Sequence, residues 1–227
     1  YGANYQYISV TNLGSNSTAY SAAPFVVTFP SNGITDFASD PNLTSVSGLR
    51  TIVMGDLDKD GKPDLVAEGS PSSIYVFRNV SVASGVLAYT LLTLSSSYVE
   101  HFGRIAVGDL DGDGWPDIAL GAYNGGVAGA VSVFRNVTAA VGSLSLSAEQ
   151  TVATGGGFIG VVMSDLDLDG RPDIVTTDHF LNRVLFFRNL STSGTISFDA
   201  PVIITGFSIN PWGLAVGDLD KDGKPDV

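Results

Sequence analysis

The residues best suited to chemistry in this chain are aspartates that recur in a fixed nine-residue pattern. The pattern D-x-D-x-D-G-x-x-D occurs four times, as DLDKDGKPD at residues 56–64, DLDGDGWPD at 109–117, DLDLDGRPD at 165–173 and DLDKDGKPD at 218–226. Alternate residues of a tight loop turn their carboxylates toward one centre, where hard divalent cations take several oxygen ligands. The spacing therefore predicts four cation-binding loops.

We number the residues of each loop from 1 to 9 and expect ligands at the odd positions. Carboxylates serve at positions 1, 3, 5 and 9, the last of them bidentate, and position 7 serves through its backbone carbonyl. Glycine at position 6 permits a sharp turn with positive φ, and proline at position 8 stiffens the exit. The expected ligands are Asp56, Asp58, Asp60, Lys62 and Asp64; Asp109, Asp111, Asp113, Trp115 and Asp117; Asp165, Asp167, Asp169, Arg171 and Asp173; and Asp218, Asp220, Asp222, Lys224 and Asp226.

The expected cation is Ca²⁺, with about four ions in the chain, one per repeat. Three or four carboxylates in one cage exceed what Mg²⁺ normally recruits, and transition metals favour the His or Cys that the loops lack. The pattern resembles an EF-hand loop but closes at position 9, without flanking helices, which places it between strands. The alternative is an acidic, solvated turn, and four copies in phase argue against it.

Charge and composition exclude several classes of protein. Lys and Arg number 11 against 23 Asp and Glu, a net charge of −12, which argues against a nucleic-acid partner. No run of apolar residues is long enough for a membrane span. The absence of cysteine excludes disulfides, Cys-ligated metals and thiol nucleophiles. The first residues do not match a signal peptide, so we expect a cytosolic protein or a mature or excised chain.

The loops belong to a repeat of about 55 residues, since they begin at residues 56, 109, 165 and 218. Apolar segments separated by turn residues predict four short strands per repeat, and no segment has helical periodicity. First strands are expected at residues 51–55, 105–108, 161–164 and 214–217, and second strands at 65–67, 118–120 and 174–176, with Val227 beginning a fourth. Third strands are expected at 74–79, 131–136 and 184–189, and fourth strands at 88–94 and 196–204.

Four antiparallel strands per repeat predict an all-β fold, a β-propeller of four-stranded blades in one domain. Both faces of the third strands are apolar, as stacked blades require: Val76, Val133 and Leu185 are expected on one face and Phe77, Phe134 and Phe186 on the other. A β-sandwich, the alternative, would have one polar face per sheet. The repeats span residues 50–104, 105–160, 161–213 and 214–227, and residues 1–49 complete the last.

The two ends of the chain carry complementary halves of that last blade. Residues 5–12 align with the third strands, residues 24–29 resemble a fourth strand, and residues 214–227 supply a first strand and a loop. The blade can close within the chain, giving a four-bladed ring, or between neighbouring chains, giving a polymer. The chain can also be part of a longer array. The sequence leaves all three arrangements open.

The repeats resemble the FG-GAP/VCBS family, the calcium-binding blades shared with the integrin α-subunit head. The second repeat carries the resemblance most fully, with FG at residues 102–103, the loop, and GA at 121–122. The third and fourth repeats have IG at 159–160 and WG at 212–213 instead of FG. The resemblance implies an extracellular location, secreted or at the cell surface, and roles in adhesion, in sugar binding or as a non-catalytic domain. Propellers of this family usually have seven blades, so four is a departure.

Other residues offer weaker signals. Asparagines in N-x-S/T sequons are candidates for glycosylation, although they also suit turns: Asn16, Asn42, Asn79, Asn136 and Asn189. The two histidines, His101 and His179, lie in no recognisable nucleophile or acid–base arrangement, so we expect no enzyme. Trp115, Tyr123 and Trp212 are candidates for sugar stacking or for packing between blades.

The sequence therefore predicts an extracellular β-propeller module for binding, adhesion or assembly, in which calcium is structural. Its partner would be a protein, a glycan or neighbouring copies of itself, with no nucleic acid and no membrane span. A carbohydrate-binding lectin is one alternative. A self-assembling surface or fibre protein that shares blades between subunits is another.

Overall fold

The computed structural model describes residues 46, 48–69, 72–82, 87–98, 104–124, 127–207 and 210–227, and four short strands before them. The chain divides into two units, Tyr1–Ser39 and Asp40–Val227. The larger unit contains the repeats and their loops. Sixteen strands and no helix are found in the described residues, which confirms the expected all-β class. No helix in this part of the chain could therefore span a bilayer.

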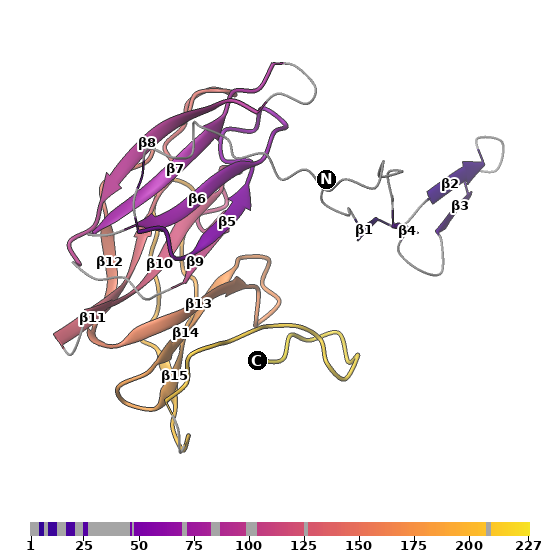
Figure 1. Cartoon of the computed structure of the whole chain (residues 1–227). Helices are drawn as coiled ribbons and strands as arrows, with labels where there is room; N and C mark the ends of the chain where they lie inside the picture. The colour runs from indigo at the N-terminus through magenta and orange to yellow at the C-terminus, as the bar shows by residue number, and fades with distance from the viewer. Residues whose placement is uncertain are drawn as a thin grey trace, which may run out of the picture. The chain divides into compact units, whose positions relative to one another are not determined.

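Three four-stranded antiparallel sheets make up most of the larger unit, and in each one the strands pair in chain order (Figure 1). The first sheet consists of β5 (Ile52–Gly55), β6 (Asp64–Gly69), β7 (Ser73–Asn79) and β8 (Tyr89–Ser95). The second consists of β9 (Ile105–Gly108), β10 (Asp117–Asn124), β11 (Val127–Phe134) and β12 (Gln150–Gly156). The third consists of β13 (Phe158–Ser164), β14 (Asp173–Asp178), β15 (Arg183–Phe187) and β16 (Val202–Ile204). The first three Asp loops each connect the first two strands of their sheet.

The fourth repeat departs from the expected pattern. Residues 214–217 form no strand, and the only pairing described there is an isolated antiparallel bridge between Gly217 and Asp226. A strand needs a ladder of partners, and this segment has only the residue at the far end of its own loop. The fourth loop is therefore present without a sheet around it.

The N-terminal unit contains two short antiparallel pairs. Strand β1 (Tyr5–Gln6) pairs with β4 (Phe25–Val26), and β2 (Ser9–Asn12) pairs with β3 (Ser17–Tyr20). Strands β1 and β2 lie in the expected third-strand segment and β4 lies in the expected fourth-strand segment. Both pairings are internal to this unit.

The core consists of two apolar clusters, and the second sheet contributes to both. The first cluster joins the first two sheets through Leu57, Val66, Ile74, Val76, Ile105, Ile118, Leu120 and Phe134. The second joins the last two sheets through Leu110, Ala119, Val131, Val133, Phe158, Val161, Ile174, Leu185, Phe187 and Ile196. Both faces of the second sheet are thus buried, unlike those of a sandwich sheet with one solvated face.

The faces of the third strands follow the expected alternation in the first two sheets. In the second sheet, Phe134 packs toward the first sheet and Val133 toward the third. In the third sheet the pattern is displaced by one residue, because Phe187 is buried beside Leu185 whereas Phe186 is only half-buried. The repeat aligns on its Arg-Asn pair, so Phe187, and not Phe186, is the counterpart of Phe134.

The leucine at loop position 2 connects each loop to the core. Leu57 and Leu110 are fully buried, and each belongs to the cluster between its own sheet and the next one. Leu166 is half-buried, and Leu219 is 82% exposed. The same motif residue is therefore a core residue only where a following sheet covers it.

This difference predicts unequal effects of one substitution at two equivalent positions. Leu110→Ala is expected to lower the free energy of unfolding by about 2–5 kcal/mol, because it leaves a cavity in the core. Leu219→Ala is the matched control, and while Leu219 is exposed it is expected to change that free energy by no more than about 0.5 kcal/mol. Denaturant unfolding of both variants measures the difference. A loss below about 1 kcal/mol in Leu110→Ala would contradict its place in the core, and equal large losses would mean that a following sheet covers Leu219 as well.

Candidate metal centres

Each Asp loop gathers three carboxylates at one point. The oxygens of positions 1, 3 and 9 lie within 4.8 Å of one another in all four loops. The clusters are Asp56, Asp58 and Asp64; Asp109, Asp111 and Asp117; Asp165, Asp167 and Asp173; and Asp218, Asp220 and Asp226. An all-oxygen, carboxylate-rich set is the donor chemistry that suits Ca²⁺.

Backbone N–H groups of the loop hold the first carboxylates in place. In the second loop, Asp109 accepts a hydrogen bond from the Gly114 nitrogen (2.8 Å), and Asp111 accepts one from the Asp113 nitrogen (3.1 Å). The same two bonds occur in the other three loops. The position 6 glycines have φ between +84° and +93°, as expected for so tight a turn.

Position 9 closes the loop from the other side. One oxygen of Asp117 accepts the backbone N–H of Leu110 (2.8 Å) and the other accepts that of Asn136 (2.7 Å). Asp64 and Asp173 make the same pair of bonds, and Asp226 makes the first of them. This carboxylate therefore ties the start of the loop to the third strand, and a cation would share oxygens that already accept backbone hydrogen bonds.

The position 5 carboxylates lie outside the three-membered clusters. Each accepts the backbone N–H of position 7 and faces a cationic side chain. Their ion pairs are Asp60 with Lys62, Asp113 with Arg135, Asp169 with Arg171 and Arg188, and Asp222 with Lys224. The structure thus brings together the side chains of positions 1, 3 and 9 of the expected ligand set and leaves the position 5 carboxylate outside that cluster. Ligation by position 7 through its backbone carbonyl stays a prediction.

An arginine that the sequence analysis did not select pairs with position 3. Arg78 donates to Asp58, Arg135 to Asp111, and Arg188 to Asp167 (2.6 Å). The hydrogen bond from Arg135 to Asp111 also raises the pKa of the guanidinium. The available signal was the recurrence of F-R-N, in phase with the loops, in three repeats.

Burial makes the closing carboxylates unfavourable as isolated anions. It raises the pKa of Asp64, Asp117 and Asp173, to about 7 in the case of Asp117, and neighbouring aspartates add to the effect while backbone hydrogen bonds oppose it. One oxygen of Asp56, Oδ1, is buried without a hydrogen-bond partner among the described residues. A cation would satisfy that oxygen and favour the ionised carboxylates, so the residues present fit Ca²⁺.

The asparagines of three candidate sequons face the protein interior. Asn79, Asn136 and Asn189 are buried, and the Nδ2 atom of each donates to a backbone carbonyl. Because a glycan would be attached at Nδ2, it would replace these hydrogen bonds, and the packing favours the turn-forming role. Asn16 and Asn42 lie outside the described residues.

Two of the three candidate stacking residues meet at one aromatic cluster. His179 lies between Tyr123 (ring centroids 5.9 Å apart) and Trp212 (4.7 Å), and Phe180 packs against Tyr123 (4.9 Å). Trp115 has a different neighbour, Lys59, whose Nζ lies 5.3 Å from its ring centroid. His101 lies outside the described residues.

Comparison with known families identifies the repeat. A family profile described as FG-GAP-like repeat matches residues 56–120, 109–176 and 165–227, which together cover most of the chain. Each match begins at position 1 of an Asp loop and includes the next loop. The comparison with curated proteins finds no match.

The raised pKa of Asp117 predicts proton release on cation binding. A carboxyl with a raised pKa favours the folded state below about pH 7 and disfavours it as the pH rises through that value. At about pH 6 the folded, cation-free protein therefore holds this proton, and Ca²⁺ must displace it.

We expect Ca²⁺ to release protons at about pH 6, measured with an indicator dye in weak buffer, and to release almost none at about pH 8.5. The affinity of the second loop should fall as the pH drops below 7, by at most about tenfold per unit. An affinity that does not depend on pH across this range would contradict the assignment.

Proposed function

The chain belongs to the family of FG-GAP-like repeats, and on that basis we propose that it is an integrin-like repeat module stabilised by calcium. The proposed module is extracellular, secreted or at the cell surface, and serves in binding, adhesion or assembly without catalysing a reaction. Its partners are a protein, a glycan or neighbouring copies of itself. The observation that carries the proposal is the cluster of three carboxylates repeated at the same positions of four loops.

The proposed role of calcium is structural. Each of the first three loops joins the first two strands of its sheet, and the loop leucine is part of the core in the first two repeats. Carboxylates held so close together repel one another, and a divalent cation converts this repulsion into attraction. Since the unfolded chain lacks a preformed site, the binding free energy contributes directly to folding. Each loop would take one Ca²⁺, about four ions in all.

Removal of calcium is expected to destabilise the protein strongly. A ligand present at a hundred times its Kd adds about 2.7 kcal/mol per site, and about 1 kcal/mol shifts the Tm of a chain of this size by about 2–4 °C. We therefore expect EDTA to lower the Tm by more than about 10 °C, and excess Ca²⁺, but not equimolar Mg²⁺, to restore it. An unchanged Tm in EDTA would reject the structural role.

We further propose that the sheets are blades of a propeller whose closing blade combines residues 214–227 with residues 1–49. Ile105, at the start of the second sheet, is buried by the first, whereas its counterpart Ile52 is exposed, as is Met54. At the other end Leu219 is exposed although Leu57 and Leu110 are buried. The exposed side chains of Ile52 and Met54 at one end, and of Leu219 at the other, occupy the positions whose counterparts form the contacts between successive sheets.

Closure within one chain and closure between chains differ in molar mass. Multi-angle light scattering over a range of concentrations separates a monomeric ring from a self-assembling surface or fibre protein. A longer array would show the same surfaces covered by further repeats.

A carbohydrate-binding lectin is the second candidate function, and the aromatic cluster favours it. Trp212 is 55% exposed beside His179, and the side-chain amide of Asn210 lies 3.4 Å from the His179 ring. An exposed indole next to polar groups suits the apolar face and the hydroxyl groups of a sugar ring.

The lectin hypothesis predicts glycan binding that depends on Trp212. On a glycan array, the calcium-loaded protein should bind at least one sugar, and Trp212→Ala should lower that binding at least about tenfold, because the stacking surface is lost. Val202→Ala, at an exposed apolar position on β16, is the control and should bind normally. An array without any signal would count against a lectin.

A further inference from the structure

The asparagine of the second F-R-N reaches back into the loop of the first repeat. The Nδ2 atom of Asn136 donates to the carbonyl oxygen of Leu57 (2.8 Å), 79 residues earlier, and also to that of Pro116 in its own loop (2.9 Å). Asn136 is fully buried. A single side chain therefore binds position 2 of the first loop and position 8 of the second loop.

The third repeat makes the same contacts with the second. Asn189 Nδ2 donates to the carbonyl oxygen of Leu110 (2.8 Å), again 79 residues earlier, and to that of Pro172 (2.7 Å). The counterpart in the first repeat, Asn79, donates to Pro63 of its own loop (3.1 Å), and no second acceptor is found for it within the described residues. The recurrence at an identical separation shows that the contact belongs to the repeat.

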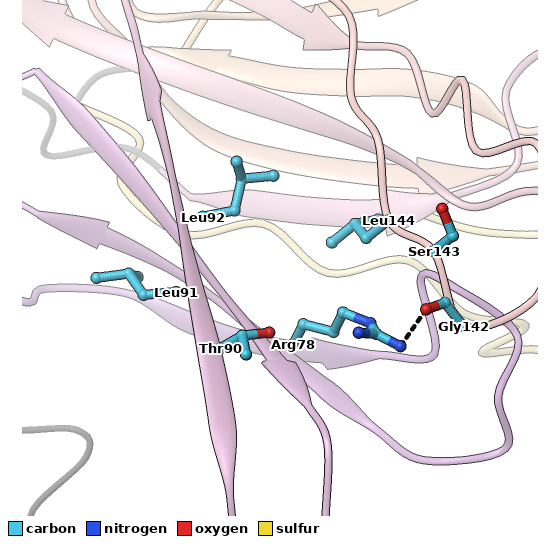
Figure 2. Close-up of a pocket in the computed structure, with 7 residues that line it drawn as sticks. All are labelled: Arg78, Thr90, Leu91, Leu92, Gly142, Ser143 and Leu144. Carbon is cyan, nitrogen blue, oxygen red and sulfur yellow. Dashed lines mark hydrogen bonds between the residues drawn. The ribbon is translucent and has the colours of Figure 1, made fainter.

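A second contact reaches the same loops from the turn that follows the third strand. The Gly142 nitrogen donates to the carbonyl oxygen of Asp58 (2.9 Å), and the Gly142 carbonyl accepts from Arg78, as Figure 2 shows. The turn and the first sheet line a hollow of about 400 Å³ at this point. The Gly194 nitrogen likewise donates to the carboxylate of Asp111 (2.9 Å).

Both contacts act on loop positions 2 and 3, and position 3 carries one of the three clustered carboxylates. We propose that each repeat completes the cation site of the repeat before it, with the F-R-N asparagine as the positioning residue. The inference rests on the proposed calcium binding, and it adds that support for each site comes from the following repeat and not from the preceding one. A loop whose backbone is already fixed loses less conformational freedom on binding, so its affinity is higher.

The exposure of the position 3 aspartate agrees with support from the following repeat. Asp58 and Asp111 are buried, whereas Asp167 and Asp220, at the same position of the third and fourth loops, are exposed. No asparagine or turn glycine from a following repeat contacts either of these later loops within residues 127–207 and 210–227. As long as no following repeat covers the last two loops, the first two sites are therefore expected to bind more tightly than the last two.

Terbium luminescence tests the proposal, since Tb³⁺ replaces Ca²⁺ and is sensitised by a nearby indole. Trp115 lies at position 7 of the second loop, and the chain has one other tryptophan, Trp212. The Nζ atom of Lys59, in the first loop, lies 5.3 Å from the Trp115 ring centroid, so that loop must be disabled as well. In a parent with Trp212→Phe and Asp56→Asn, which removes one of the clustered carboxylates of the first loop, the signal reports the second loop. Asn189→Ala removes the contact to that loop from the following repeat, and Asn79→Ala removes the equivalent side chain from the preceding repeat.

We expect Asn189→Ala to weaken Tb³⁺ binding at the second loop by about three- to tenfold, the effect of losing one buried hydrogen bond. Asn79→Ala should change it by less than about twofold, because its side chain contacts only the first loop. Equal losses in both variants, or no loss in either, would overturn the proposal. A general structural role of these asparagines predicts the equal losses.

A reporter in the first loop keeps the test decisive if Asn189→Ala unfolds part of the protein. Lys62→Trp, combined with Trp115→Phe and Trp212→Phe, moves the indole to position 7 of that loop. Here Asn136→Ala should weaken binding and Asn189→Ala should not, whereas an unfolded variant loses signal at both reporters. If neither parent protein binds Tb³⁺ at its reporter loop, the proposed calcium binding fails. If both bind, but the substitutions in the following and the preceding repeat have the same effect, only the further inference fails.

Discussion

Mutual repulsion among clustered carboxylates is the constraint that shapes this protein. Three aspartate oxygens within 4.8 Å of one another are stable only where positive charge or N–H dipoles face them. Backbone donors at positions 2, 5 and 6 and an arginine from the third strand supply part of this compensation, as in the pairing of Arg135 with Asp111. Burial chiefly, and the neighbouring aspartates to a smaller extent, raise the pKa of Asp117, so the proposed Ca²⁺ would have a thermodynamic role in favouring its ionised form.

The loops and the core are stabilised together because they share residues. Leu110 lies between two loop aspartates in the sequence, and its side chain packs among the apolar side chains that join the second and third sheets. Asp117 closes the loop and is also the first residue of β10. Disturbing the carboxylates therefore moves a strand and a core side chain, which is why a cation at the surface of a sheet can contribute to the stability of the whole stack.

Local patterns in the sequence were sufficient to predict most strands of the three sheets but not the contacts between repeats. The alternation of apolar residues placed three sheets, and the D-x-D-x-D-G-x-x-D spacing placed the three clustered carboxylates of each loop, at positions 1, 3 and 9, among the four that it predicted. The contact of Asn136 with Leu57 spans 79 residues, and no local pattern contains it. The ion pair of Asp113 with Arg135 depends in the same way on the fold. Residues 214–217 have the composition of a strand, but among the described residues no neighbouring strand pairs with them.

The backward reach of Asn136 also fixes an order in time. A nascent chain leaves the ribosome N-terminus first, so the first loop emerges before the asparagine that holds it has been translated. At ordinary rates of synthesis, 79 residues correspond to a delay of about 4–16 s. The backbone of each loop would therefore be fixed only after the following repeat has been synthesised. Each ion would bind tightly only when the chain has grown by one further repeat.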